Sequence, residues 1–390
     1  MYTILRKAVD ILASYGFACL IFLFLLLLTY LGTLEQVEHG LYETQQRYFA
    51  SLFLVHEFFG VVPVVLPGVR LLLTLLFINI VCGGIVRMRK GWRQLGVMIV
   101  HVGIIVLLVG GYITYRFSMD GHLTLYENQQ SSEFQSYHTW EIALAQPNED
   151  GSRSEYIVSD TMFAHLGPDG STTFQAEGLP FEITIRGYTE NARPVRAAGN
   201  RAASNPVVDG FYLEPLPLEK ENERNAAGAY VTLTEKNGGV KHDGILWGLA
   251  TAPLAMAIDG QPWQIDLRRQ RWELPFAIHL DRFTRELHPR TSMAKAFMSD
   301  VTKIEGGTEQ KIKISMNEPL RHKGYTLYQA SWGPADAGPN DRLFSTFAVV
   351  RNPADKFPLY ACVIITFGLL FHFSQKLFRF LRAEQKKVAA

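Results

Sequence analysis

The chain is 390 residues long, 48% of its residues are hydrophobic, and its formal net charge is +1 at pH 7. It lacks the basic surplus of a nucleic-acid-binding protein, so we expect no nucleic-acid partner. All three cysteines, Cys19, Cys82 and Cys362, fall in long apolar runs. The remainder of the chain therefore offers no disulfide, no CxxC redox pair and no CxxCH haem-attachment motif.

Four apolar runs, with Arg70 as their one charged residue, are long enough to cross a bilayer, at residues 14–33, 69–86, 95–115 and 357–375. Each has roughly the 20 residues that a transmembrane helix needs. The first run is longer than the apolar core of a secretory signal, so we interpret it as an uncleaved anchor. The sequence therefore predicts four transmembrane α-helices in contact with the lipid bilayer.

Lysine and arginine cluster before the first run, between the second and third, and after the fourth, at 6–7, 87–93 and 376–387. Four crossings place all three clusters on one side, which the positive-inside rule assigns to the cytoplasm. Both termini are then cytoplasmic and the long segment 117–350 lies outside, which fits a bacterial inner (plasma) membrane with a domain in the periplasm.

The segment between the first two runs predicts an interfacial helix near 41–58, because aromatic residues recur on one side and Pro63 and Pro67 follow. His39 and His56 lie in or beside it, and a functional role for them competes with simple surface exposure. In the second run, Asn79 is expected to bind a neighbouring helix through its amide rather than a ligand.

Residues 117–350 predict a large all-β extracytoplasmic domain, because short alternating segments are separated by turn signals. Residues 1–116 then hold the first three helices, and 351–390 hold the fourth with a basic tail. A short helix at 289–298 is the one expected exception to the β structure. Residues 179–194 and 274–289 share a pattern, which predicts two related β units. Its histidines show no metal-ligand spacing and are interpreted as structural or solvated.

The third apolar run carries two separate features. Gly96, Gly103 and Gly110 repeat every seven residues and so fall on one side of a helix, where another helix can approach closely. His101 lies well round the helix from them. An imidazole inside the membrane is costly and predicts either a ligand for a metal, such as haem iron, or a hydrogen bond to a neighbouring helix.

The fourth run contains a second intramembrane histidine, His372. It could be a second axial ligand, or it could reach the membrane interface beside Lys376. Both imidazoles lie in the half of the membrane that borders the basic segments. Arg87 and Arg93 could neutralise haem propionates there, although the positive-inside rule explains them equally well.

Five segments carry a resemblance to a known family: GTLEQ (32–36), RYFAS (47–51), HVGIIVLLVGGYIT (101–114), DGHLTLYENQ (120–129) and KISMNEPLRHKGYTLYQASW (313–332). Together they resemble the ResB (CcsB) family of system II cytochrome c biogenesis proteins. The resemblance implies a subunit that exports haem b across the membrane and supports its covalent attachment to apocytochrome c.

The same resemblance implies that His101 is an axial ligand of haem iron and that a CcsA/ResC-type membrane subunit supplies the opposite ligand. The tryptophan-rich haem-presenting motif of that subunit is absent here, so the chain would be a non-catalytic or half-site subunit of a holocytochrome c synthase, with a thiol-reducing periplasmic protein as a further partner. Two alternatives remain open: a b-type cytochrome in quinol-linked electron transfer that uses His101 and His372 within one chain, and a haem-free periplasmic docking scaffold.

Overall fold

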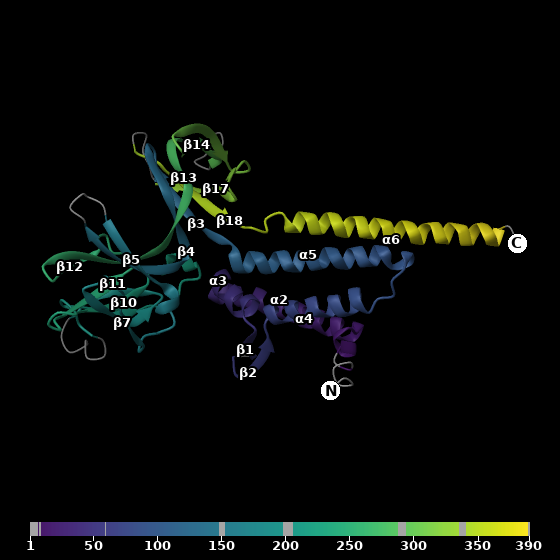
Figure 1. Ribbon diagram of the computed structural model, residues 1–390, viewed down its shortest axis with the longest axis horizontal. Helices are drawn as coiled ribbons and strands as arrows, with labels where there is room; N and C mark the ends of the chain where they lie inside the picture. Colours follow the sequence, from purple (N-terminus) through teal and green to yellow (C-terminus); the bar gives the residue numbers. More distant parts are fainter. Residues whose placement is uncertain are drawn as a thin grey trace. The chain divides into compact units, whose positions relative to one another are not determined.

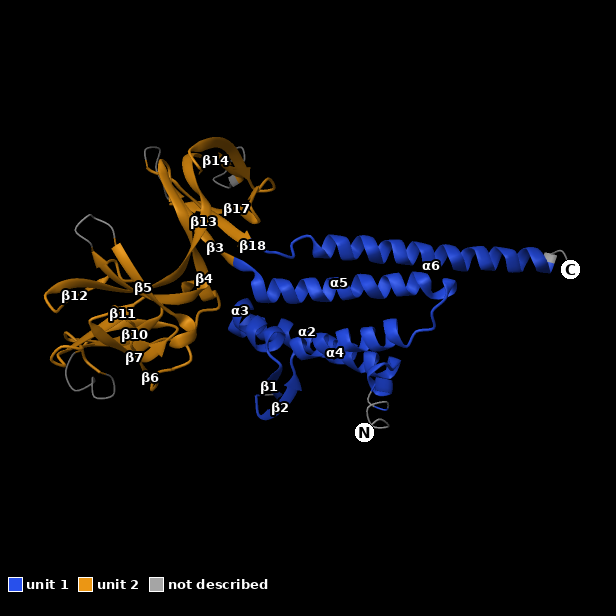
Figure 2. Ribbon diagram, in the orientation of Figure 1, with its two compact units in different colours: residues 1–119, 351–390 blue, residues 120–350 orange. Residues whose placement is uncertain are grey.

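The computed structural model describes residues 7, 9–58, 60–147, 153–197, 206–287, 294–334 and 341–388. The chain forms two compact units (Figure 2). The first, here the helical unit, comprises residues 1–119 and 351–390, and the second, the β unit, comprises residues 120–350. The chain enters the β unit once and returns once, so each unit has a core of its own.

The helical unit contains four helices that are long and apolar enough to cross a membrane (Figure 1). They are α2 (Tyr15–His39), α4 (Val69–Asn79) continued by the π-helix η2 (Ile80–Val86), α5 (Leu95–Phe117) preceded by the short η3 (Trp92–Gln94), and α6 (Phe357–Val388). The four predicted spans are confirmed, and the chain is a multi-pass membrane protein.

Helices α5 and α6 lie side by side along the glycine stripe (Figure 1). A Cβ added to Gly103 would lie 2.6 Å from Ile365 Cγ1, and one added to Gly110 would lie 2.5 Å from Phe357 Cβ. Only glycine leaves room for α6 at this spacing, since a helix without side chains lets a neighbouring backbone approach. The predicted role of the stripe is confirmed.

The segment between α2 and α4 is only partly helical. It forms α3 (Leu41–Thr44) and the π-helix η1 (Gln45–Ala50), then a hairpin of β1 (Phe53–Phe58) and β2 (Val62–Pro67). The predicted interfacial helix over 41–58 is therefore wrong beyond Ala50. The β-branched valines of this segment favour a strand, and the pairing of β1 with β2 satisfies its backbone hydrogen bonds. The spacing of the aromatic residues gave no indication of this pairing.

Asn79 is buried near the junction of α4 and η2 and bridges to the start of α2. Its Nδ2 atom donates to the carbonyl of Leu12 at 2.6 Å and to that of Ser14 at 3.1 Å. Leu12 precedes α2 and Ser14 is its N-cap, so the amide of Asn79 ties the second span to the start of the first. The predicted helix-joining role of the amide is confirmed.

The β unit is built on two sheets. The larger has ten strands in the order β15-β14-β13-β4-β3-β18-β17-β16, with β12 beside β13 and β5 beside β4, and the smaller has the order β11-β10-β7-β6. The strands of the larger sheet are β3 (Met119–Tyr126), β4 (Gln129–Pro147), β5 (Arg153–Ser159), β12 (Leu254–Ile258), β13 (Gln261–Leu287), β14 (Ala294–Glu305), β15 (Thr308–Ser315), β16 (Leu320–His322), β17 (Tyr325–Gly333) and β18 (Phe344–Arg351). Those of the smaller are β6 (Ser171–Phe174), β7 (Phe181–Thr189), β10 (Gly228–Glu235) and β11 (Lys241–Trp247), and a hairpin of β8 (Ala192–Arg196) and β9 (Phe211–Pro215) is separate. The predicted fold class, four helices with a β domain between the third and fourth, is confirmed.

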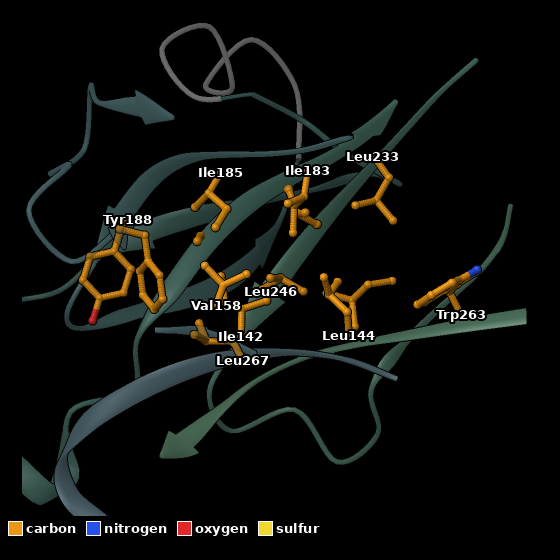
Figure 3. Close-up of a cluster of buried hydrophobic side chains, with 14 of the residues drawn as sticks. Ile142, Leu144, Val158, Ile183, Ile185, Tyr188, Leu233, Leu246, Trp263 and Leu267 are labelled. Atoms are coloured by element: carbon orange, nitrogen blue, oxygen red, sulfur yellow. The ribbon is translucent and has the colours of Figure 1, made fainter. Parts of the chain in front are cut away.

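The smaller sheet packs on one half of the larger (Figure 3). Ile183 and Ile185 of β7 and Leu233 of β10 face Ile142 of β4 and Trp263 of β13, and none of these side chains is more than 2% exposed. Burying a large aliphatic or aromatic side chain contributes roughly 1.5 to 3 kcal/mol, so this cluster is a main source of the β unit's stability.

Two expectations for the β unit are corrected. The segments 263–269 and 276–283 appear in the sequence as separate strands, whereas β13 runs through both as one strand of 27 residues. Pro275 does not end it, because the pairing of β13 with β4 shifts register between Glu273 and Ile278. The short helix predicted over 289–298 is wrong for 294–298, which begin β14, and 289–293 lie outside the described residues.

Candidate functional site

His101 lies in the first half of α5 and packs against the π-helix that ends the second span. A Cβ added to Gly84 of η2 would lie 2.9 Å from His101 Cγ and 3.0 Å from His101 Nδ1. Single π-turns often occur at functional sites, because the wider turn redirects the residues that it carries. Here η2 brings a residue without a side chain against the imidazole, so the ring fits between the two helices.

The imidazole of His101 is partly buried and makes no hydrogen bond with any other residue that the structure describes. Its Nδ1 atom is buried without a partner. A buried polar atom without a partner is costly and indicates that something outside the described chain completes the site. Of the two possibilities open from the sequence, a hydrogen bond to a neighbouring helix is not found among the described residues. The role of His101 as a metal ligand stays a prediction.

His372 has a different neighbour. A Cβ added to Gly96 would lie 2.8 Å from His372 Cβ, so His372 borders the glycine side of α5, whereas His101 borders η2. The Nδ1 atom of His372 is also buried without a partner among the described residues. The structure therefore does not bring the two imidazoles to one side of α5. Gly368 of α6 packs on Gly96 and Val100.

The arginines considered for haem propionates lie in the basic segment between η2 and α5. Arg87 forms an ion pair with Asp10 through Nη1 and Oδ1 at 3.0 Å, and both side chains are exposed. Arg93, in η3, is exposed as well. A cavity of about 180 Å³ adjoins this segment and is lined by Trp92 and Met98 among others. Within the described chain, no group of three or more metal-ligating side chains is found.

A polar network that the sequence did not predict joins α2 to η1. Arg47 Nη1 donates to Glu35 Oε1 at 2.6 Å, and Tyr48 Oη lies 3.3 Å from Glu35 Oε2. Arg47 also donates to the carbonyl of Val55 in β1 at 2.7 Å. The segments GTLEQ and RYFAS, both part of the family resemblance, therefore meet through an ion pair. The sequence signal for this ion pair was a carboxylate at the end of an apolar helix, followed by an arginine in the same external segment.

The two histidines of this region belong to the same network. His56 Nδ1 lies 2.6 Å from Tyr48 Oη, and His39 Nδ1 lies 3.4 Å from Glu35 Oε1. Tyr48 is fully buried. Burial first and the Glu35 carboxylate second raise the pKa of Tyr48 to about 12. The phenol is thus neutral at physiological pH and links an acidic and an imidazole side chain, while neither histidine is simply exposed.

The segment 313–332 is explained by the β core. It contains the hairpin of β16 and β17, whose turn places Lys323 at φ 46° and Gly324 at φ 81°. The Ser299 hydroxyl donates to Gln329 Oε1 at 2.7 Å, and Gln329 Nε2 donates to Ser345 Oγ at 2.8 Å, all three residues being buried. Gln329 therefore joins β14, β17 and β18, as the structural interpretation of this segment requires.

The aromatic end of this segment is also packed. The ring of Trp332 stacks on Phe283 with centroids 5.8 Å apart, and the guanidinium of Arg285 lies 4.4 Å from the Trp332 ring centroid. Such cation–π contacts stabilise an exposed site by roughly 0.5 to 1 kcal/mol. Phe283 belongs to the repeated pattern at 274–289, so the pattern and the segment 313–332 form one aromatic cluster.

Four histidines of the β unit have polar partners, as the structural interpretation predicted. They are His138 with Asn222, His242 with Glu235, His279 with Asp281 and His322 with Glu305, at distances of 2.7 to 2.8 Å. His122 differs, because its Nδ1 atom is buried without a partner among the described residues. Burial first and Arg269 second lower the pKa of His122, so its ring is neutral.

Comparison with known proteins agrees with the resemblance stated from the sequence. The model of the ResB-like family matches residues 264–343, the segment from β13 to the start of β18. Cytochrome c biogenesis protein CcsB of Prochlorococcus marinus (strain NATL2A) is 43% identical over 72 residues, which is 18% of this chain and 17% of that protein. The protein of the same name from Synechococcus sp. (strain CC9605) is 26% identical over 186 residues, 47% of this chain and 38% of that protein.

The aligned regions thus span well under two thirds of these relatives. The match to the family model lies within the β unit. The matched segment holds the Gln329 network and the Trp332 cluster described above. These matches confirm the resemblance to the ResB (CcsB) family, and residues 264–343 carry it.

Proposed function

We propose that the chain is a subunit of a system II cytochrome c maturation complex that exports haem and supports its covalent attachment to apocytochrome c. Its relatives carry the name cytochrome c biogenesis protein CcsB, which supports the role in cytochrome c maturation. Four membrane helices joined to a large β unit suit a protein that passes a membrane-soluble cargo to a partner outside the lipid.

The observation that carries the proposal is the free imidazole of His101. A neutral histidine on an apolar helix, with no hydrogen-bond partner in the described chain, can bind haem iron without breaking an existing contact. When bound, the haem supplies the iron and an apolar ring that replaces lipid around the histidine. Gly84 orients the imidazole, while Arg87 and Arg93 supply positive charge for the propionates.

The second axial ligand comes from a CcsA/ResC-type subunit under this proposal. His372 lies on the glycine side of α5 and His101 on the η2 side, which does not favour a pair within one chain. The partner would also provide the attachment chemistry, and the complex would keep the iron reduced. A thiol-reducing periplasmic protein would keep the thiols of the apocytochrome reduced. The complex would lie in a bacterial inner membrane with the β unit in the periplasm.

The test is co-purification of the full chain with its CcsA/ResC-type partner, followed by a reduced-minus-oxidised haem spectrum. His101→Ala should lower the haem content of the complex at least about tenfold, as expected for removal of a metal-binding residue. The matched control is His242→Ala, which removes an imidazole that already binds Glu235 in the β unit. That variant should keep its haem.

Three results would contradict the proposal. Equal haem loss in the two variants would show that the effect is not specific to His101. Stoichiometric haem in the chain without its partner, lost in His372→Ala and kept in His101→Ala, would show that His101 is not the haem ligand. A complex without any haem absorbance would favour a docking scaffold.

A further inference from the structure

A cavity of about 400 Å³ lies at the distal end of the helical unit, the end opposite the basic segment 87–93. One wall is the face of α2 that carries Gly32 and Gln36. The other walls are α3 with η1, which carry Thr44 and Phe49, and Tyr115 at the end of α5. A volume of this size is in the range of small-molecule sites, and it is separate from the surroundings of His101.

The described side chains around this distal cavity carry hydroxyl, amide, aromatic or apolar groups and no formal charge. No lining side chain is a cation, and Arg70, beside the cavity, donates to Tyr115 Oη at 3.0 Å. A phosphate headgroup or a haem propionate would therefore lack a cation in the lining, and leaving a charge without a partner is costly. The lining therefore favours a ligand whose polar end is neutral.

Thr44 provides the second observation. It is 2% exposed, and its hydroxyl is buried without a hydrogen-bond partner among the described residues. Other threonines of the same unit behave differently: the hydroxyls of Thr29, Thr33 and Thr74 donate to the carbonyl four residues earlier at 2.7 to 2.8 Å. Thr44 is one of the lining residues, and a buried hydroxyl that forgoes this local bond retains its hydrogen-bonding capacity for a ligand.

An aromatic side chain forms part of the cavity wall. The Phe49 side chain packs on α2 at Gly32, where an added Cβ would lie 3.3 Å from Phe49 Cε2. Gln36 and Gln45 contribute amide groups that can donate or accept. Beside this wall, Tyr30 and Leu34 of α2 are exposed apolar side chains on a membrane helix, along which a hydrocarbon tail can lie.

We infer that the distal cavity binds the neutral headgroup of a quinone or quinol. The hydroxyl of Thr44 donates to a quinone carbonyl or accepts from a quinol hydroxyl, the amides of Gln36 and Gln45 serve the opposite oxygen, and Phe49 covers the ring. The tail of the ligand extends along α2 into the lipid. This inference concerns binding alone and does not depend on haem or on the proposed function.

The test uses the full chain in nanodiscs of neutral phospholipid and a benzoquinone with a ten-carbon tail, as a radiolabelled ligand and as its azido derivative. Binding should be saturable, and Thr44→Val should weaken it roughly fivefold, the effect expected of one hydrogen bond. Thr44→Ser keeps the hydroxyl and should bind as the unmodified chain does. Thr74→Val is the matched control, since that hydroxyl is already bound within its own helix.

Photolabelling of the unmodified chain gives a readout that does not depend on any variant. The label should appear between residues 29 and 50 or at Tyr115. Labelling elsewhere, absence of saturable binding, equal weakening by Thr44→Val and Thr74→Val, or displacement of the quinone by anionic phospholipid would each overturn the inference. The last result would identify a lipid headgroup as the occupant.

Discussion

The histidines of the helical unit and those of the β unit differ in their surroundings. In the β unit, His242 and His322 each meet a carboxylate within 2.8 Å, whereas in the membrane helices the Nδ1 atoms of His101 and His372 are buried without a partner among the described residues. A paired imidazole stabilises its neighbours and is not available for another ligand. An unpaired one in an apolar setting is available, so the two units use the same residue type for different purposes.

His39, His56 and His122 limit this comparison. The first two lie at the end of the membrane helices and belong to the network of Glu35 and Tyr48. His122 lies in the β unit, yet its Nδ1 atom has no partner in the described chain. The distinction thus follows local surroundings rather than the unit as such. Carboxylates are available where water reaches, and they are rare inside the membrane.

The largest expected effect is on the packing that holds His372 beside α5. Gly103→Leu places a side chain where even a Cβ would lie 2.6 Å from Ile365 Cγ1, which should destabilise the helical unit by about 1 to 3 kcal/mol or more. Gly111→Leu is the matched control, because nothing lies within 4 Å of a Cβ at that position. The yield of folded protein and its thermal unfolding in detergent measure both. Similar losses would place the α5–α6 contact elsewhere.

An intermediate effect is expected for the residue that positions His101. Gly84→Ala adds a Cβ at 2.9 to 3.0 Å from the imidazole, so the ring must move while the helices stay packed. Under the proposed function, haem content of the complex should fall roughly tenfold, the typical effect of disturbing a group that orients a metal ligand. Gly111→Ala should leave the haem spectrum unchanged. A normal spectrum in Gly84→Ala would show that η2 does not orient the ligand.

The smallest effect concerns a paired histidine. Hydrogen bonds from Lys323 first and from His322 second hold the pKa of Glu305 below its ordinary 4.5. A carboxyl group with a lowered pKa contributes stability above its ordinary pKa, and this contribution is lost as the pH falls through the folded-state value.

The β unit should therefore lose stability below pH 4.5 more steeply in the unmodified chain than in Glu305→Gln. Urea unfolding followed by tryptophan fluorescence, at neutral pH and in acid, measures this difference. Glu309→Gln, at an exposed position of β15, is the control and should unfold as the unmodified chain does. Identical acid profiles for Glu305→Gln and the unmodified chain would show that the pairs of Glu305 with Lys323 and His322 add nothing.

The helical spans could be predicted closely because each is a continuous apolar run, a local property. The glycine spacing likewise predicted a close helix contact on one side of α5. The hairpin of β1 and β2 could not be predicted from aromatic spacing, since its hydrogen bonds join residues across a turn. The π-turns of η1 and η2 have no local sequence signal, and they position Tyr48 and Gly84.

Most of the β structure showed its alternation and turn residues, as at Asp259 and Gly260, which both have positive φ. The order of the strands in the sheets could not be predicted, because β13 pairs with β4, which lies more than 100 residues earlier in the chain. The polar network of Glu35 and Arg47 was missed for a similar reason. Both residues can be read from the sequence, but whether they form an ion pair depends on how α2 and η1 pack together.

The sequence by itself determined which segments enter the membrane, most of the strands of the β unit and which side of α5 admits a neighbour, because burial and backbone geometry follow from local composition. Only the tertiary structure decided which histidines are paired, that His101 faces η2 and His372 the glycine stripe, and that a neutral cavity with an unpaired Thr44 hydroxyl lies between α2 and η1. These features depend on distances between distant residues, and local pattern contains no information on them.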